Sequence, residues 1–175
     1  LGNLHYQEGD HAGAQRHWEA SLYLCRELGN SEDLCSCLNN LGLLHFERSH
    51  YATAERLYRE ALEIQTSLNP KHHQIAVLHD NLAELYLDLD QLGRAEEEIR
   101  LAEQVAEELD AAAILTELWA KRARILSARG DTEAAREHAR RALSMVEPTG
   151  HVESLVEALI ASAEVELAAG QYKDA

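Results

Sequence analysis

Three cysteines and ten histidines are the residues of this chain best suited to binding a metal ion. Cys35 and Cys37 form a C-x-C pair, and Cys25 lies ten residues earlier. A zinc site usually contains a C-x₂₋₄-C pair together with a second pair. Two cysteines two positions apart on a predicted helix point in different directions, so they suit neither zinc nor a mutual disulfide. We therefore expect small, buried, reduced cysteines.

The histidines and the loops give no stronger sign of catalysis. His72, His73 and His79 flank a predicted helix start, but no carboxylate is placed convincingly with them. The chain has no G-x-x-x-x-G-K phosphate loop. Nothing in the sequence fixes which Ser, His, Asp or Cys residues meet, so no catalytic triad or dyad can be argued. We predict a protein without metal or cofactor that is not an enzyme.

The charge of the chain limits its partners. Its Asp and Glu residues number 31 and its Lys and Arg residues 16, a formal net charge of −15. Nucleic-acid binding without sequence preference requires clustered positive charge, and an anionic membrane surface would repel this chain. No apolar run approaches the ~20 residues that span a bilayer. We expect no nucleic acid or membrane partner for this segment, a cytoplasmic location, and a protein or peptide partner that carries basic residues.

Helices must position all these residues, because Ala, Leu and Glu dominate and only two prolines occur. The helical pattern repeats with a period near 40 residues. Its first marker is Leu1-Gly2, which recurs as Leu41-Gly42, Leu82-Ala83, Arg122-Ala123 and Ser162-Ala163. The second is a turn residue, at Gly9, Ser49, Asp90, Gly130 and Gly170, and the third is an alanine, at Ala14, Ala54, Ala95, Ala135 and Ala175. A fixed period of this length indicates stacked helical repeats.

This pattern resembles the tetratricopeptide repeat (TPR), which carries Leu-Gly, an aromatic residue, Gly, Ala, an aromatic residue and a final Ala on a helix–turn–helix unit. The resemblance covers essentially the whole chain and is strongest in the first two units, whereas Arg122, Ser162 and Glu166 depart from it. It implies an all-α, right-handed superhelical solenoid of antiparallel helix pairs. The period of about 40 rather than 34 residues resembles the long-repeat subclass of kinesin light chains, Leu-Gly-Asn repeat polarity proteins and bacterial peptide-sensing and transcription regulators.

The expected organisation is a single TPR array over 1–175. Its units span approximately 1–28 (partial), 31–68, 72–109, 112–147 and 151–175 (partial). Helices are predicted over 1–8, 11–28, 31–48, 51–68, 72–89, 92–109, 112–129, 132–147, 151–169 and from 172 onward, with helix stops at 29–30, 69–70 and 148–150. Because the chain opens and closes inside the pattern, we expect it to be a piece of a longer protein.

Two positions in this pattern need an explanation. Gly42 lies inside a predicted helix, where glycine costs about 1 kcal/mol relative to alanine. Helices that pack closely need small side chains where they cross, so we expect Ala54 to face Gly42, with Tyr58 filling the space toward the next unit. The basic residues of 121–141 are expected to pair with acidic residues of 96–108 on the preceding unit. Arg122 is the exception because it falls on an apolar stripe; it could extend outward over Trp119 or bind a ligand.

The candidate binding site is the inner face of the first helices, which line the concave side in the family that the chain resembles. The predicted groove residues are Asn3, Asn40, Leu43, Glu47, Asp80, Asn81, Glu84, Asp88, Lys121 and Arg124. Asparagine side chains both donate and accept hydrogen bonds, so they can pair with an extended peptide backbone. In the long-repeat relatives the asparagine before Leu-Gly looks like a backbone clamp, and Asn40 and Asn81 match that position.

The resemblance implies a non-catalytic protein–protein interaction scaffold that binds a peptide or helix in its concave groove. The alternative is a ligand- or peptide-sensing regulatory module of a larger signalling or transcription-regulator protein, whose effector domain lies outside this segment. A third hypothesis is self-association through the ends of the array, because the end surfaces of a cut array expose apolar residues. The sequence does not identify the partner.

Overall fold

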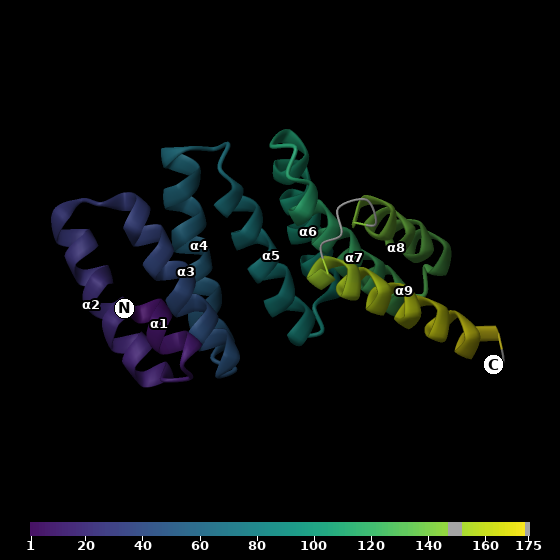
Figure 1. The fold of residues 1–175 in the computed structure, drawn as a ribbon, viewed down its shortest axis with the longest axis horizontal. Helices are drawn as coiled ribbons and strands as arrows, with labels where there is room; N and C mark the ends of the chain where they lie inside the picture. Colours follow the sequence, from purple (N-terminus) through teal and green to yellow (C-terminus); the bar gives the residue numbers. More distant parts are fainter. Residues whose placement is uncertain (147–151, 174–175) are drawn as a thin grey trace. The chain divides into compact units, whose positions relative to one another are not determined.

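The computed structural model describes residues 1–146 and 152–173, and the chain forms only α-helices within them (Figure 1). Two compact units, Leu1–Leu85 (unit 1) and Tyr86–Ala175 (unit 2), are considered separately below. The helices of the first are α1 (Gly2–Gln7), α2 (His11–Leu28), α3 (Ser31–Glu47), α4 (Tyr51–Leu68) and most of α5 (His73–Asp88). Those of the second are α6 (Leu92–Glu108), α7 (Ala112–Ala128), α8 (Thr132–Val146) and α9 (Val152–Lys173). In the described part of the chain, no helix is long and apolar enough to cross a membrane.

The turns between helices lie where the repeated turn residues predict them. Gly9, Ser49, Asp90 and Gly130 all adopt a left-handed backbone, with φ between 56° and 82°. Glycine adopts this conformation at no steric cost, and Ser or Asp can adopt it in a tight turn. Each of these turns reverses the chain between two helices, so the predicted bounds of α1 to α7 agree with the structure to within one residue.

Polar side chains fix the first turns of several helices. The Asp10 carboxylate accepts a hydrogen bond from the Gly13 backbone N–H at 2.8 Å, and Asn30 Oδ1 accepts one from the Asp33 N–H at 3.2 Å. These bonds satisfy backbone donors that a helix leaves unpaired at its N-terminus. They explain why α2 and α3 begin directly after these two residues.

The C-terminal helix differs from the prediction. A turn was expected at Gly170, but α9 runs through Gly170 as far as Lys173, and Gly170 is not among the glycines with positive φ. A turn compensates for lost helical hydrogen bonds only where the next segment packs back against the helix; the residues described after Gly170 continue the helix instead. The predicted stop at 148–150 and the repeat alanine Ala175 lie outside the described residues.

Unit 1 explains the glycine inside α3. A Cβ atom added to Gly42 would lie 2.5 Å from Cε1 and 2.7 Å from Cδ1 of Tyr58. The atoms nearest to Gly42 therefore belong to the Tyr58 ring, which was expected to fill the space toward the next unit; the expected Gly42–Ala54 crossing stays a prediction. Gly2 meets the Trp18 ring in the same way, with Nε1 2.5 Å from an added Cβ. The small residue makes room for the aromatic ring of the second helix.

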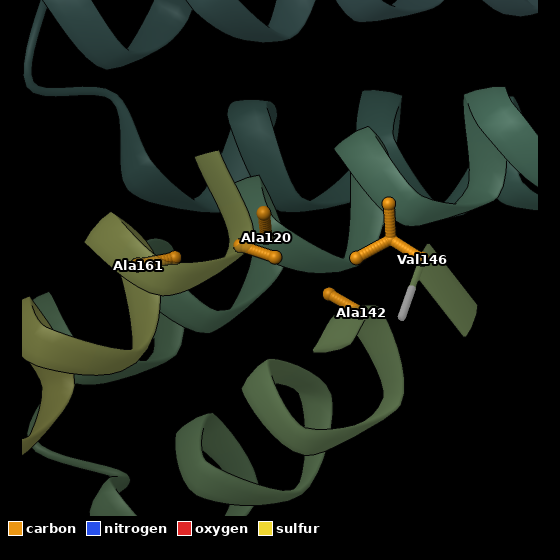
Figure 2. Close-up of a cluster of buried hydrophobic side chains, with 5 residues drawn as sticks. Ala120, Ala142, Val146 and Ala161 are labelled. Atoms are coloured by element: carbon orange, nitrogen blue, oxygen red, sulfur yellow. The ribbon is translucent and has the colours of Figure 1, made fainter. Parts of the chain in front are cut away.

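Unit 2 fills the corresponding space with alanine. Ala123, which stands in the register of Gly42, shares a buried cluster with Ala139, which stands in the register of Tyr58. A second cluster joins α7, α8 and α9 through Ala120, Ala142, Val146 and Ala161 (Figure 2). Small residues on all three helices allow close approach, and the partly buried Trp119 packs against this cluster. The single TPR array over 1–175 stays a prediction.

Candidate functional site

The asparagines predicted as a peptide clamp bond to one another in unit 1. Asn3 Oδ1, on α1, accepts hydrogen bonds from Asn40 Nδ2 of α3 at 3.2 Å and from Trp18 Nε1 at 3.0 Å. One repeat further, Asn81 Nδ2 of α5 donates to Asn39 Oδ1 of α3 at 2.9 Å. The amides therefore connect the first helices of successive repeats. Asn39 has a role here that the predicted stripe did not include.

These pairs do not use up the hydrogen-bonding capacity of the amides. Each asparagine side chain has two N–H donors and a carbonyl acceptor. Within the described residues, neither Asn40 Oδ1 nor Asn81 Oδ1 accepts a hydrogen bond. Asn3 is exposed, and Asn40 and Asn81 are half-buried. Acceptors on this face thus remain available to the N–H groups of another chain.

A second group of residues on unit 1 combines a carboxylate with tyrosines. Glu47 of α3 accepts a hydrogen bond from the Tyr6 hydroxyl, and its second oxygen lies 3.4 Å from His11 Nδ1. Burial and the Glu47 carboxylate raise the pKa of Tyr6 to about 12. Burial, followed by the carboxylates of Glu84 and Glu47, raises the pKa of Tyr58. The tyrosines stay neutral hydroxyls, and the local field is negative.

The other predicted groove residues fall in both units. Leu43 on α3 and Asp80 on α5 are half-buried in unit 1, where Glu84 is exposed. Asp88, Lys121 and Arg124 belong to unit 2, with Asp88 and Arg124 exposed and Lys121 half-buried. Arg124 Nε lies 2.9 Å from Glu164 Oε2, which pairs residues of the same register on α7 and α9. The predicted groove residues therefore occur in both units, and the contacts described for them lie within one unit or the other.

Sequence reasoning missed the contacts of Tyr6 and His11 with Glu47, and it assigned the buried Tyr58 a packing role alone. The 40-residue register aligns Tyr58 with Trp18, and this alignment was read only as packing. Tyr58 carries a hydroxyl that Trp18 lacks, and this difference could have indicated a polar role beside the carboxylates of Glu47 and Glu84. Tyr6 and His11 align with Phe46 and Tyr51 in the 40-residue register, and the Tyr6–His11 and Phe46–Tyr51 pairs each form a T-shaped ring contact. Their contact with Glu47 is not given by the register, because it depends on how α1 and α2 pack against α3.

Arg122 has a buried acidic partner, which neither sequence alternative for this residue included. Its Nη1 pairs with Oε2 of Glu103 on α6, which is 7% exposed. Burial raises the pKa of Glu103 although Arg122 acts in the opposite direction. Burial, together with Arg122 and Arg141, lowers the pKa of His138 on α8 to about 4. Glu103 Oε1, Arg122 Nε and His138 Nδ1 are buried and have no hydrogen-bond partner among the residues that the structure describes.

The cysteines are packed in the interior rather than arranged as ligands. Cys25, Cys35 and Cys37 are free and buried, which agrees with the prediction. Burial raises the pKa of Cys37 to about 11 and also raises that of Cys35. A metal ligand must be the thiolate, so these thiols are poorly suited to that role. Among the described residues, no group of three or more His, Cys, Asp or Glu side chains is placed to hold a metal ion.

Known proteins place this arrangement in a family. Two tetratricopeptide repeat profiles match the sequence, one over residues 1–67 and the other over 117–141, together more than half of the chain. No curated protein sequence matches it.

Solved structures share the fold. Aspartyl phosphate phosphatase F from Bacillus subtilis aligns at 16% identity over 99% of this chain and 46% of its own, with a TM-score of 0.84. A putative kinesin light chain from Podosopora anserina with nearly identical TPR-like repeats aligns at 19% identity over 99% of this chain and 86% of its own (TM-score 0.74). The first TPR of Spaghetti (RPAP3), bound to the HSP90 peptide SRMEEVD, aligns at 21% identity over 78% of this chain and 93% of its own (TM-score 0.57). The fold is therefore all-α and of the TPR-like solenoid class, and the chain is a tetratricopeptide repeat protein.

Proposed function

We propose that this chain is a non-catalytic protein-interaction scaffold of the long-repeat TPR subclass that binds a peptide or a partner helix on the concave face of its first helices. In unit 1 that face is carried by α1, α3 and α5. The observation that carries the proposal is the set of asparagine pairs on these helices, Asn3–Asn40 and Asn39–Asn81. Their unused acceptors suit the N–H groups of a peptide backbone.

The charge of the same face supports a partner with basic residues. Glu47 and Glu84 both raise the pKa of Tyr58, so their carboxylates lie close enough to act together. Complementary charge speeds association and selects partners more than it adds affinity. The RPAP3 repeat binds the peptide SRMEEVD, which contains three acidic residues. Carboxylates on unit 1 favour a segment of the opposite charge here.

A peptide-display selection on the 175-residue chain tests the proposal. We expect enrichment of sequences with Lys or Arg, and we expect an enriched peptide to bind more slowly as salt concentration rises. The double variant Asn40→Ala/Asn81→Ala should weaken binding by roughly 1–3 kcal/mol, the cost of leaving buried partners unpaired. Gln104→Ala, an exposed amide on α6, is the control and should bind as the parent does.

Two results would contradict the proposal. Equal affinity of parent and double variant, with an unchanged helical spectrum, would move the binding site away from the asparagines. If the selection enriches no linear peptide, the proposal that the chain is a peptide-binding scaffold is refuted. The alternative of a ligand- or peptide-sensing regulatory module stays a prediction, because the likeness to aspartyl phosphate phosphatase F shows the fold alone.

A further inference from the structure

A polar, solvent-open cavity of about 630 Å³ lies at the surface of unit 1, beside the asparagine face, with which it shares Asn39. The first turns of α3 and α5, the end of α4 and the loop that joins α4 to α5 line it. This volume falls within the ~300–1,000 Å³ typical of small-molecule sites. The loop has four residues, 69–72, whereas only 29–30 separate α2 from α3. The longer connection holds α5 away from the start of α3 and leaves the space open.

Acidic side chains give the cavity its charge. Glu32 and Asp33 line it, and no Lys or Arg is among the lining residues. Asp33 Oδ2 accepts a hydrogen bond from Asn30 Nδ2 at 2.6 Å. The Glu32 carboxylate has no hydrogen bond or ion pair within the described residues. Carboxylates in the first turn of a helix also complement its dipole, so these two residues alone do not define a site.

Gln65 is the independent observation. It lines the cavity from α4 and is only 4% exposed. In the part of the chain that the structure describes, its side-chain amide forms no hydrogen bond. Neither Oε1 nor Nε2 of Gln65 is among the fully buried polar atoms without a partner, so the amide of this otherwise buried side chain opens into the cavity that it lines, where a ligand can replace solvent. A ligand in the cavity that donates a hydrogen bond to Gln65 Oε1 would satisfy it.

Two imidazole rings form another wall. His72 Nδ1 accepts a hydrogen bond from the Gln74 backbone N–H at 3.2 Å, which places the His72 proton on Nε2 when the ring is neutral. The His72 and His73 ring centroids are 4.4 Å apart, with 32° between the ring planes. Planar cations pack well against flat rings of this kind, and guanidinium groups do so more readily than ammonium groups.

We propose that this cavity binds an organic cation through a guanidinium group. The Glu32 and Asp33 carboxylates would balance its charge, Gln65 Oε1 would accept one N–H, and the His72 and His73 rings would flank the planar group. A guanidinium has five N–H donors and no acceptor, which matches a lining that supplies oxygen acceptors and contains no Lys or Arg. The source is either a free small molecule or the arginine side chain of another protein.

The test uses three probes on the 175-residue chain at pH 8, with binding followed by NMR of the side-chain amides. N-acetyl-arginine amide carries the guanidinium, N-acetyl-citrulline amide has nearly the same shape without the charge, and agmatine represents a free cation. We expect the arginine probe to shift the Gln65 side-chain amide signals and to bind at least tenfold tighter than the citrulline probe. Tighter binding of agmatine than of the arginine probe would assign a free ligand, and the reverse order an arginine side chain.

Variants separate the contributions of the wall. Gln65→Met keeps the volume and removes the acceptor, so it should weaken the arginine probe about tenfold, the usual effect of losing a hydrogen bond to a charged group. Glu32→Gln removes one charge at the mouth and should weaken it about threefold. Glu27→Gln on α2 changes the net charge equally but lies outside the cavity, so its affinity should equal that of the parent.

The proposal is overturned if the citrulline probe binds as tightly as the arginine probe, or if no probe shifts the Gln65 amide. It is also overturned if Glu32→Gln, which changes an exposed residue, behaves like Glu27→Gln. None of these measurements involves Asn40 or Asn81. The cavity proposal can therefore be refuted while the asparagine face still binds a peptide, and the peptide-binding proposal can be refuted while the cavity still binds a cation.

Discussion

Replacing Gly42 by alanine should destabilise unit 1, although alanine is the better helix former. The added Cβ would lie 2.5 Å from Tyr58 Cε1 and 3.2 Å from Tyr58 Cζ. Carbon atoms in good contact are about 3.5–4.0 Å apart, so the ring must shift by roughly 1 Å. Tyr58 is 1% exposed, and its surroundings have no free space to accept that movement.

The magnitude is the difference between two opposing effects. Alanine in place of glycine in a helix interior gains about 1 kcal/mol. An extra carbon forced into a packed core costs about 1–3 kcal/mol. We therefore expect the free energy of unfolding to fall by up to about 2 kcal/mol. Gly42→Leu should cost more, because its side chain extends further into the space of the ring.

A double-mutant cycle isolates the contact. Tyr58→Leu alone should cost about 2–4 kcal/mol, because it leaves a cavity beside Gly42. In that background Gly42→Ala no longer meets a ring and should become stabilising. The coupling energy between the two positions should therefore be about 1–3 kcal/mol, well above the few tenths found for distant sites.

The assay is equilibrium unfolding in urea, followed by the helical circular dichroism of each variant. Gly93→Ala is the matched control, since an added Cβ there meets nothing within 4 Å. It reports helix propensity alone and should stabilise by no more than about 1 kcal/mol. The reasoning is refuted if Gly42→Ala stabilises as much as Gly93→Ala, or if the coupling with Tyr58→Leu is zero.

Three further predictions concern buried polar groups. Arg122→Leu should lower the free energy of unfolding by about 3 kcal/mol because it leaves the buried Glu103 carboxylate without its ion-pair partner, whereas Arg122→Leu/Glu103→Met should unfold at or above the urea concentration of the parent. His138 has its pKa lowered to about 4 by burial, so the folded state disfavours its protonation; stability present above pH ~6.5 should be lost as the pH falls toward 4. In urea titrations at pH 7 and pH 5, His138→Gln should reduce this loss of stability by about 1 kcal/mol, after allowance for the partial exposure of His138. The raised pKa of Glu103 acts in the opposite sense but is common to parent and variant. A pH dependence that is the same in both proteins would contradict the assignment to His138. Replacing Cys25, Cys35 and Cys37 together by serine or alanine should preserve the helical spectrum, and a chelator should not lower the melting temperature; zinc bound stoichiometrically by the parent and lost in the triple variant would contradict this.

The helices could be predicted from the sequence because local signals define their ends. Asp10 and Asn30 each accept a hydrogen bond from the backbone N–H group three residues ahead, and Ser49 takes the left-handed conformation of a turn. Such interactions depend on neighbours in the chain, so spacing alone reveals them. Gly170 carries the same local signal without a turn. A turn at that position depends on tertiary packing, which the local sequence does not encode.

The candidate site was predictable only in part. The register placed Asn40 and Asn81 on the first helices, and the structure has them there, with Asn39 and Asn3 as partners. Which asparagine meets which depends on the distance and rotation between helices of successive repeats. Packing between helices also sets the meeting of Tyr6 with Glu47. A repeat register gives the face of a residue but not its partner.

The size of the residue facing Gly42 shows the same limit in the core. The alanines in register directed attention to small residues, but the atoms nearest to Gly42 belong to Tyr58 and those nearest to Gly2 belong to Trp18. Where the first position becomes Ala123, the second becomes Ala139. The two positions share one volume, so a larger residue at one requires a smaller residue at the other. The informative pattern was the combined size of the residues at the Gly42 and Tyr58 positions, rather than the residue type at either position alone.

Arg122 extends this reasoning from volume to charge. Leu41 and Leu82 occupy its register and are buried, so an arginine there would be strongly unfavourable by itself. It is tolerated because α6 presents Glu103 on its own buried face, where a carboxylate would be equally unfavourable without Arg122. Removing either residue leaves an uncompensated charge, whereas removing both does not. A basic residue at a core position of a helical repeat therefore predicts an acidic residue on the buried face of the preceding helix.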